Sequence, residues 1–126
     1  MVMSSAPPIL APCPKTPNCV STQASDPDKH MAPIPFNGDL DTARTRLLAV
    51  LSRIPRVDVV ETRPHYVHAV FTSRLMRFKD DVEFAFDTEA SVIHFRSASR
   101  VGRSDWGVNR ERMERFTNKF LELDPP

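Results

Sequence analysis

Apolar side chains recur at helical spacing in two segments of the chain, one near the middle and one at the end. The first segment follows a capping Asn37 or Asp39 and ends before Pro55. The second begins near SDWGVN and runs almost to Pro125. We therefore expect two amphipathic helices. Their apolar stripes are Leu40, Ala43, Leu47, Leu51 and Ile54 in the first, and Trp106, Asn109, Met113, Phe116 and Phe120 in the second.

Between these helices, apolar and polar residues alternate with the period of two that is typical of β-strands. VDVVETR (57–63) and HYVHAVFTSR (65–74) are β-branched and aromatic runs, and DVEFAFDTEASVIHFRS (81–97) is typical of a hairpin turning at Thr88–Ala90. The RLMRFKD segment reads as a connecting loop. Hairpin-length connections imply antiparallel pairing. We predict an α+β two-layer sandwich, a four-stranded antiparallel sheet with two helices on one face, in the order α-β-β-β-β-α.

The chain before the first helix lacks this periodicity and is rich in proline. Proline fixes φ and removes a backbone donor, so an extended arm is expected rather than a helix or a central strand. The expected organisation is a flexible N-terminus (1–12), an extended arm packed on the domain (13–38) and an α+β domain (39–124), one domain in all.

Alternation along the strands also sorts polar side chains onto the sheet face that points away from the helices. The simpler interpretation of this face is a solvated surface laced with cross-strand ion pairs, each contributing roughly 0.2–1 kcal/mol. The functional interpretation is a concave polar site covered by the arm, with Glu83, His68 and His94 as candidate catalytic acid–base residues. The ionisable members of the set are His68, Arg74, Asp81, Glu83, Asp87, His94 and Arg96.

An arginine-rich stretch, RSASRVGRSDWGVNRER (96–112), leads from the last strand into the second helix. Arg96 is expected to end the strand, with a loop beginning at Ser97. Small residues and arginines before a helix N-terminus favour an anion site, although the spacing matches no phosphate-binding motif. The simpler interpretation is ion pairing with nearby carboxylates, and Asn109 is expected to hold the loop backbone through its buried amide. The candidate ligand-binding residues are Arg96, Ser99, Arg100, Arg103, Asn109 and Arg110, with Arg74 and Cys19 from outside the stretch.

Two cysteines, Cys13 and Cys19, lie close together in the arm. A pair of reduced thiols in a loop is the simplest interpretation, and a local disulfide is the main alternative. A metal site that also used His30 would lack a fourth ligand, and no nearby charge at a fixed spacing activates Cys19 as a nucleophile. We therefore expect no metal.

The net charge of +1 gives no global attraction to DNA or to an anionic membrane, so neither nucleic acid nor membrane is an expected partner. No apolar run is long enough to span a bilayer and no signal peptide is visible, so a cytoplasmic location is expected. No dinucleotide or metal motif is present, so no cofactor is expected. The pattern carries no information on the oligomeric state.

Four blocks, NCVST, HMAPIPF, SRLMRFKDDVEF and IHFRSASRVGRSDWGVNRERME, together resemble the bacterial and plant family catalogued as domain of unknown function fourteen-ninety-nine. The family has no assigned reaction, so the resemblance implies which residues belong together and no activity. The positions that match its pattern are Asn18, Cys19, Ser21, Asp80, Asp81, Glu83, Arg96, Ser97, Ser99, Arg100, Gly102, Asp105, Asn109 and Arg110.

Two functions fit these features. The first is binding of a small anionic molecule, a carboxylate or a phosphate, or proton-transfer catalysis on it (isomerisation, cyclisation or dehydration), at the polar face and the arginine-rich loop. The alternative is a non-enzymatic interaction or assembly protein that docks a protein partner with the same face and arm. A cavity of roughly 300–1,000 Å³ lined by Glu83, His94 and Arg96 would favour the first. A flat face with its ions paired would favour the second.

Overall fold

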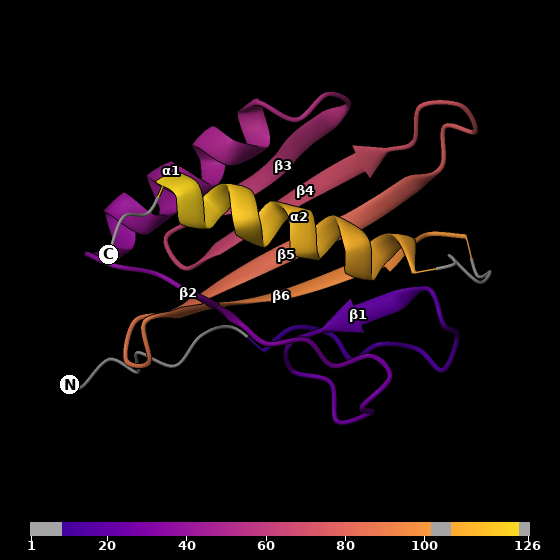
Figure 1. Cartoon of the computed structure of the whole chain (residues 1–126), viewed down its shortest axis with the longest axis horizontal. Helices are drawn as coiled ribbons and strands as arrows, with labels where there is room; N and C mark the ends of the chain where they lie inside the picture. Colours follow the sequence, from indigo (N-terminus) through magenta and orange to yellow (C-terminus); the bar gives the residue numbers. More distant parts are fainter. Residues whose placement is uncertain (1–8, 102–106, 124–126) are drawn as a thin grey trace.

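The fold is an antiparallel sheet covered on one face by two helices (Figure 1). The computed structural model describes residues 9–101 and 107–123. Arg103 and Trp106 of the sequence analysis lie outside these ranges. The elements are β1 (Cys19–Ser21), β2 (Ile34–Pro35), α1 (Leu40–Ser52), β3 (Val57–Arg63), β4 (Tyr66–Thr72), β5 (Lys79–Asp87), β6 (Val92–Ser99) and α2 (Val108–Leu123).

The sheet has six strands, so the expected four-stranded sheet and the order α-β-β-β-β-α are wrong in this respect. The strand order is β1-β6-β5-β4-β3, and β2 also pairs with β6. The two additional strands come from the proline-rich segment and run antiparallel to β6, with Cys19 opposite Ala98 and Ile34 opposite Ile93. They contain 3 and 2 residues, too few to show a period of two in the sequence.

The helices begin and face the sheet as their apolar stripes predict. The Asp39 carboxylate caps α1 by accepting a hydrogen bond of 2.8 Å from the Thr42 amide, and this bond lowers the pKa of Asp39 below its ordinary value of 3.8. Within the described residues of the two stripes, the buried positions are Ala43, Leu47 and Leu51 in α1 and Asn109, Met113, Phe116 and Phe120 in α2.

The core lies between the helices and the alternating apolar side chains of the strands. Val67, Phe84 and Phe95 are each 0% exposed, and the Phe84 and Phe116 rings lie 5.0 Å apart between β5 and α2. Burying each such side chain contributes about 2–3 kcal/mol. The sorting of strand residues onto a helix-facing side is therefore confirmed, and the opposite face carries the polar set.

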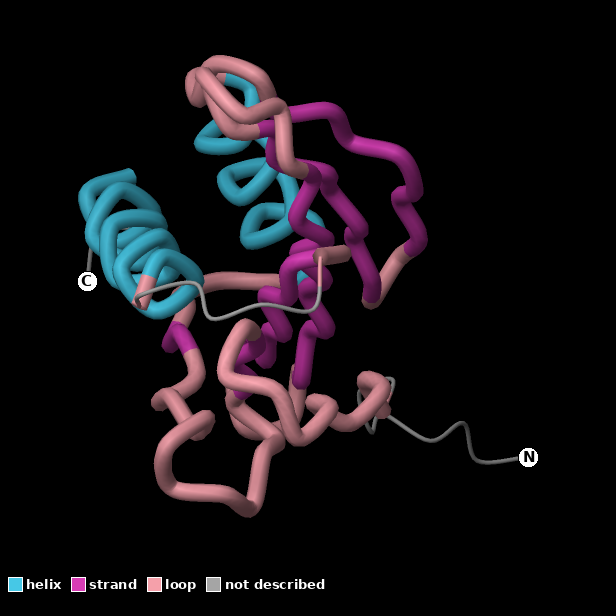
Figure 2. The backbone as a smooth tube through the Cα atoms, turned by 90° about the vertical axis from the view of Figure 1, so that its right-hand side faces the viewer, coloured by secondary structure: helices cyan, strands magenta, loops and turns pink. Residues whose placement is uncertain are grey.

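Figure 2 shows both helices on the same side of the strands. The other face of the sheet carries no helix in the described part of the chain. In the same residues, neither helix is long and apolar enough to cross a membrane.

Candidate functional site

The predicted polar residues meet on the sheet face opposite the helices, because neighbouring strands bring them into register. His68 of β4 lies opposite Glu83 of β5, Glu83 lies opposite Arg96 of β6, and Arg96 lies opposite Ser21 of β1. Directly opposed side chains of an antiparallel pair are close enough to interact. The polar face is therefore a continuous row that crosses four strands.

Asp81 forms the first charged group on this face. Arg100 binds its carboxylate with both ends of the guanidinium, at 2.9 Å (Nε–Oδ2) and 3.0 Å (Nη2–Oδ1). His68 Nε2 lies 2.8 Å from Asp81 Oδ1. The hydrogen bond from Arg100 lowers the pKa of Asp81 below its ordinary value of 3.8 and outweighs the opposing effect of burial. Arg100 and His68 are thus engaged with Asp81, as the ion-pair interpretation of the sequence expects for Arg100.

Glu83 forms the second group, with Tyr66 and Arg96. The Tyr66 hydroxyl donates a hydrogen bond of 2.5 Å to Glu83 Oε2, and Arg96 Nη1 lies 3.7 Å from Glu83 Oε1. Burial, followed by the hydrogen bond to Glu83, raises the pKa of Tyr66 above its ordinary value of 10.0. Tyr66 therefore stays a hydrogen-bond donor at neutral pH, and Glu83 Oε2 accepts its hydrogen bond.

His94 lies on the same face but in a separate contact. Its Nδ1 is 2.9 Å from Thr22 Oγ1, and the Thr22 oxygen also accepts a hydrogen bond of 3.0 Å from the Phe95 amide. Burial lowers the pKa of His94 below its ordinary value of 6.5, and the Asp87 carboxylate only partly offsets this effect. The structure therefore does not bring His94, His68 and Glu83 into one hydrogen-bonded group.

The segment before β1 crosses the polar face. Leu10 is 5% exposed and packs with Tyr66 and Ala85, while its amide donates a hydrogen bond of 2.9 Å to Gln23 Oε1. Two residues later, the Pro12 carbonyl accepts a hydrogen bond of 3.4 Å from Arg96 Nη2. These contacts place Leu10–Pro12 over β4, β5 and β6, above the Arg96 side chain. Together with Cys13, these residues form the Leu10–Cys13 crossing.

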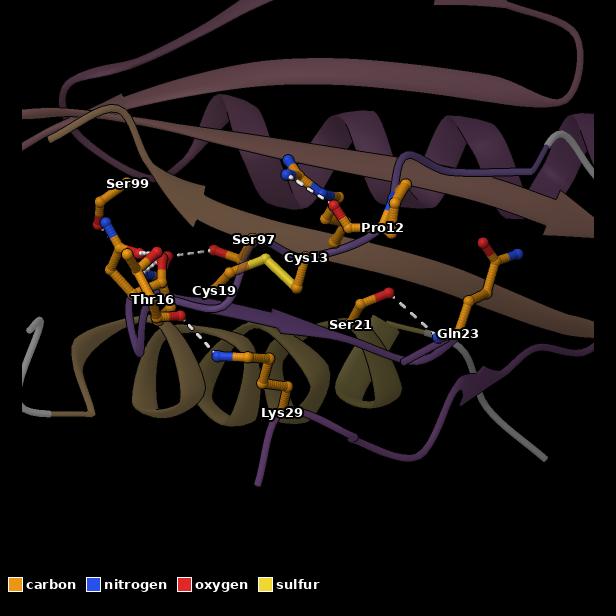
Figure 3. Close-up of a disulfide and its surroundings, with 12 residues drawn as sticks. Pro12, Cys13, Thr16, Cys19, Ser21, Gln23, Lys29, Ser97 and Ser99 are labelled. Carbon is orange, nitrogen blue, oxygen red and sulfur yellow. Dashed lines mark hydrogen bonds between the residues drawn. A yellow bond between two sulfur atoms is a disulfide. The ribbon is translucent and has the colours of Figure 1, made fainter. Parts of the chain in front are cut away.

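A disulfide between Cys13 and Cys19 fixes this crossing (Figure 3). The pairing of β1 with β6 points Cys19 to the polar face. The segment that crosses this face before β1 places Cys13 at a Cα–Cα distance of 5.7 Å from Cys19. The interpretation of the cysteines as reduced thiols is therefore wrong, and the alternative of a local disulfide is confirmed. Cys19 is 1% exposed and bonded, so it offers no thiol to a ligand.

A cavity of 420 Å³ opens beside this crossing, between the segment at 9–15 and the loop that follows β1. The lining includes Pro12 and Ser21, both of which neighbour Arg96. Lys29, which is 8% exposed, also lines it and donates a hydrogen bond of 2.5 Å from Nζ to the Thr16 carbonyl (Figure 3). The cavity is of the size that small ligands occupy. Its lining does not include Glu83, His94 or Arg96, so it borders the predicted site without coinciding with it.

In the described part of this region, the Arg96 guanidinium makes only long contacts. Its side chain is 15% exposed, and its contacts to Glu83 and Pro12 are long, at 3.7 Å and 3.4 Å. Its Nε is buried and has no hydrogen-bond partner among the described residues. Buried donors are normally paired with a protein group, an ordered water or an ion.

The structure divides the predicted ligand-binding residues between the two faces of the sheet. β6 continues to Ser99 rather than ending at Arg96, so Ser97 and Ser99 point toward α2. Asn109 Nδ2 donates to Ser99 Oγ and to the Asn18 carbonyl, both at 3.1 Å, and Ser97 Oγ donates to Asn109 Oδ1 at 2.6 Å. The Asn109 amide therefore holds the backbone of Asn18. Residues 102–106 of the loop after β6, which the prediction concerns, lie outside the described residues.

Sequence reasoning missed two residues of this buried polar cluster, Arg112 and Asp80. Arg112 donates to Asp80 Oδ2 at 2.5 Å and to Asn109 Oδ1 at 2.6 Å. The signal was available, because Arg112 follows Asn109 by one helical turn and Asp80 is in phase with the helix-facing Val82.

Two of the remaining predicted residues, Arg110 and Arg74, belong to other elements than Arg96. Arg110 Nη2 donates to the carbonyls of Asp28 and His30, at 2.9 Å and 3.2 Å, and so holds the loop after β1. Arg74 is exposed in the loop between β4 and β5. Arg103 lies outside the described residues.

These features define an α+β domain in which the chain's own N-terminal segment, held by a disulfide, covers a polar sheet face. A family model described as protein of unknown function (DUF1499) matches residues 9–120. The chain belongs to this family, as the resemblance of its sequence motifs indicates. No curated protein matches the sequence.

Proposed function

We propose that the protein binds a small anionic molecule, a carboxylate or a phosphate, beside Arg96 under the Leu10–Cys13 crossing. The observation that carries the proposal is the buried Arg96 Nε, which lacks a partner in the described part of the chain. A guanidinium presents five donors in a rigid fork that matches carboxylate and phosphate geometry. An anion that accepts from Arg96 would satisfy this donor.

The neighbouring cavity supports the same proposal. Its lining includes Lys15, Lys29 and the carboxylate of Asp26, so cations outnumber anions. Pro12 and Ser21 connect it to Arg96. A ligand of modest size would thus place its acidic group at Arg96 and the rest of the molecule in the cavity.

Binding is better supported than proton transfer, because each candidate acid–base residue is engaged elsewhere. His68 contacts Asp81, His94 contacts Thr22, and Glu83 accepts from Tyr66. Glu83 is the one of the three that also contacts Arg96, so it would be the acid–base group nearest a bound anion.

The disulfide bears on where this binding takes place. Disulfides persist in oxidising compartments and are rare in the cytosol. The bond between Cys13 and Cys19 therefore favours an oxidising compartment over the cytoplasmic location expected from the sequence. Alkylation of free thiols in intact cells, followed by a gel-shift assay, tests this choice. Protection of both cysteines supports the oxidising compartment, and their modification supports the cytoplasm.

The test of binding is a thermal-shift screen against inorganic phosphate, nucleotides and small carboxylic acids. A ligand that binds only the folded state raises its stability by about 2.7 kcal/mol at a hundredfold excess over Kd. The shift should disappear in Arg96→Ala and persist in Arg53→Ala, a matched change at the exposed arginine that caps the C-terminus of α1. A shift that persists in folded Arg96→Ala would contradict the proposal. No shift across the panel would also count against it and would favour the docking of a protein partner by the same face.

A further inference from the structure

The loop between β4 and β5 exposes bulky apolar side chains at the end of a hairpin. Leu75 is 87% exposed, Met76 is 67% exposed and Phe78 is 44% exposed. Single exposed apolar residues are ordinary on protein surfaces, but adjacent ones at a hairpin end form a patch. Figure 1 shows this loop at the edge of the molecule, beyond the helices.

Cations alternate with these apolar residues. Arg74, Arg77 and Lys79 are all exposed, and residues 73–79 contain no carboxylate. The two carboxylates that follow are already engaged, Asp80 by Arg112 and Asp81 by Arg100. The loop is therefore apolar and positively charged at once.

A cavity of 410 Å³ lies at the base of the loop and is lined by Arg56, Asp58, Thr72, Arg77 and Lys79. Three of these five residues are cations and one is an anion. A second cavity of 210 Å³ shares Arg56 and Thr72 and continues toward α2, where its lining adds Arg112, Arg115 and Lys119. Arg112 is paired with Asp80 and Arg115 with Glu111, so Lys119 carries the added positive charge on this side of the loop.

The loop is held in a defined conformation rather than left open. The Ser73 amide donates to the Phe78 carbonyl and the Phe78 amide donates to Ser73 Oγ, both at 2.8 Å. Arg77 has a φ of 58° and Arg56, across the cavity, has a φ of 59°. Side chains other than glycine adopt this left-handed region at a cost, and such costs concentrate at functional sites.

We infer that the Ser73–Lys79 loop docks onto the surface of an anionic phospholipid membrane. Leu75, Met76 and Phe78 would enter the boundary between head groups and acyl chains. Arg56, Arg77 and Lys79 would contact lipid phosphates and carboxylates. Interleaved cationic and apolar side chains match a charged, layered surface of this kind.

This site is separate from the anion site at Arg96, and either can exist without the other. The net charge of +1 over the whole chain predicts no membrane partner. Membrane attraction depends on the charge within a screening length of the surface, which is about 8–10 Å in physiological salt. The charge of the loop itself therefore determines its attraction to a membrane, and the net charge of the whole chain does not.

The test is cosedimentation of the purified, oxidised protein with vesicles of phosphatidylcholine alone or mixed equally with phosphatidylserine. The protein should sediment with the mixed vesicles, less so at high salt, and stay in solution with phosphatidylcholine alone. Excess soluble glycerophosphoserine should not displace it, because a free head group does not engage the apolar side chains. Sedimentation with both kinds of vesicle alike, sedimentation with neither, or displacement by the soluble head group would overturn the proposal. The second result would leave the exposed patch to a protein partner.

Two variants separate binding from folding. The double change Leu75→Ser and Met76→Ser should abolish sedimentation, whereas Leu121→Ser, at a leucine of α2 that is 41% exposed, should not. Arg77→Gly should lower the vesicle partition coefficient about fivefold. Its Tm should stay equal or rise, because glycine adopts a positive φ without strain. Arg63→Asn is the matched charge control. Arg63 lies at the turn between β3 and β4, at the end of β4 that is remote from the loop. Loop variants that sediment like the wild type would refute the inference.

Discussion

Arg112 of α2 and Asp80 of β5 form an ion pair of 2.5 Å between layers, with side chains only 14% and 9% exposed. Arg112 also donates to Ser97 Oγ at 3.2 Å and to Asn109 Oδ1 at 2.6 Å. The polar edge of the core is therefore one hydrogen-bonded cluster, shared by α2, β5 and β6. It lies on the helix face of the sheet, whereas Arg96 lies on the other.

Removing the anion of this pair should be costly. Asp80→Ala leaves the Arg112 guanidinium buried without its counter-charge, and we expect a loss of about 3 kcal/mol in the free energy of unfolding. Asp41→Ala removes an exposed partner of Arg44 and should cost under about 1 kcal/mol. Urea denaturation measures both. Equal losses in the two variants would show that the buried pair contributes no more to the free energy of unfolding than the exposed pair does.

The Asn109 amide should matter because it links the segment before β1 to β6. Asn109→Ala removes the donors to Ser99 and to the Asn18 carbonyl, so buried groups lose their partners, and we expect a loss of about 2 kcal/mol. Asn118→Ala, at an exposed position of the same helix, should change stability by less than about 0.5 kcal/mol. Hydrogen exchange should also show faster exchange around Asn18 in the first variant. Unchanged exchange there would contradict the proposed link.

Stability should fall as the pH drops below 6.5, the ordinary pKa of histidine, because burial lowers the pKa of His94. Above 6.5 His94 is neutral in both states. Below 6.5 the unfolded chain binds a proton that the folded chain resists, so the free energy of unfolding decreases until the pH passes the folded-state pKa. His94→Gln should flatten this decrease in denaturation curves recorded across the window. A decrease of the same size in the variant would contradict the assignment.

The disulfide should hold the Leu10–Cys13 crossing over the polar face. It closes a short loop, with a sequence separation of 6, so the double change Cys13→Ser and Cys19→Ser should cost about 2 kcal/mol. The Leu10 amide, which donates to Gln23, should lose protection from hydrogen exchange, while the β4–β5 amides keep theirs. Equal protection of Leu10 in the reduced and oxidised protein would show that the crossing is held without the bond.

The sequence predicted the elements whose side chains carry a clear period. β4, β5 and β6 contain 7, 9 and 8 residues with one face in the core, so their alternation fixed which residues share a face. In the same way, the apolar stripes of the two helices predicted which of their side chains are buried against the sheet. The placement of His68, Glu83 and Arg96 on the polar face followed from this alternation alone, whereas their cross-strand register did not.

The parts that the sequence did not predict depend on contacts between distant segments. β1 and β2 exist because β6 offers a free edge, and no local pattern indicates pairing across more than 70 residues, as between Cys19 and Ala98. Ser97 and Ser99 resemble a loop in composition, yet pairing with β5 keeps them in β6. The disulfide followed from the position that β1 gives to Cys19. Arg96 therefore lies on the polar face as its alternation predicts, whereas Asn109 contacts the helix face of the sheet.

If Arg96 holds an anion, the side-chain Nε–H signal of Arg96 in a proton–nitrogen correlation spectrum should respond when that anion binds. Titration with inorganic phosphate and with succinate, against chloride at the same ionic strength, should shift this signal saturably for at least one of the two anions. The amides of Ser21 and Gln23, beside the cavity, should move with it. A signal that stays in place, or that changes equally in all three salts, would show that Arg96 binds neither phosphate nor succinate.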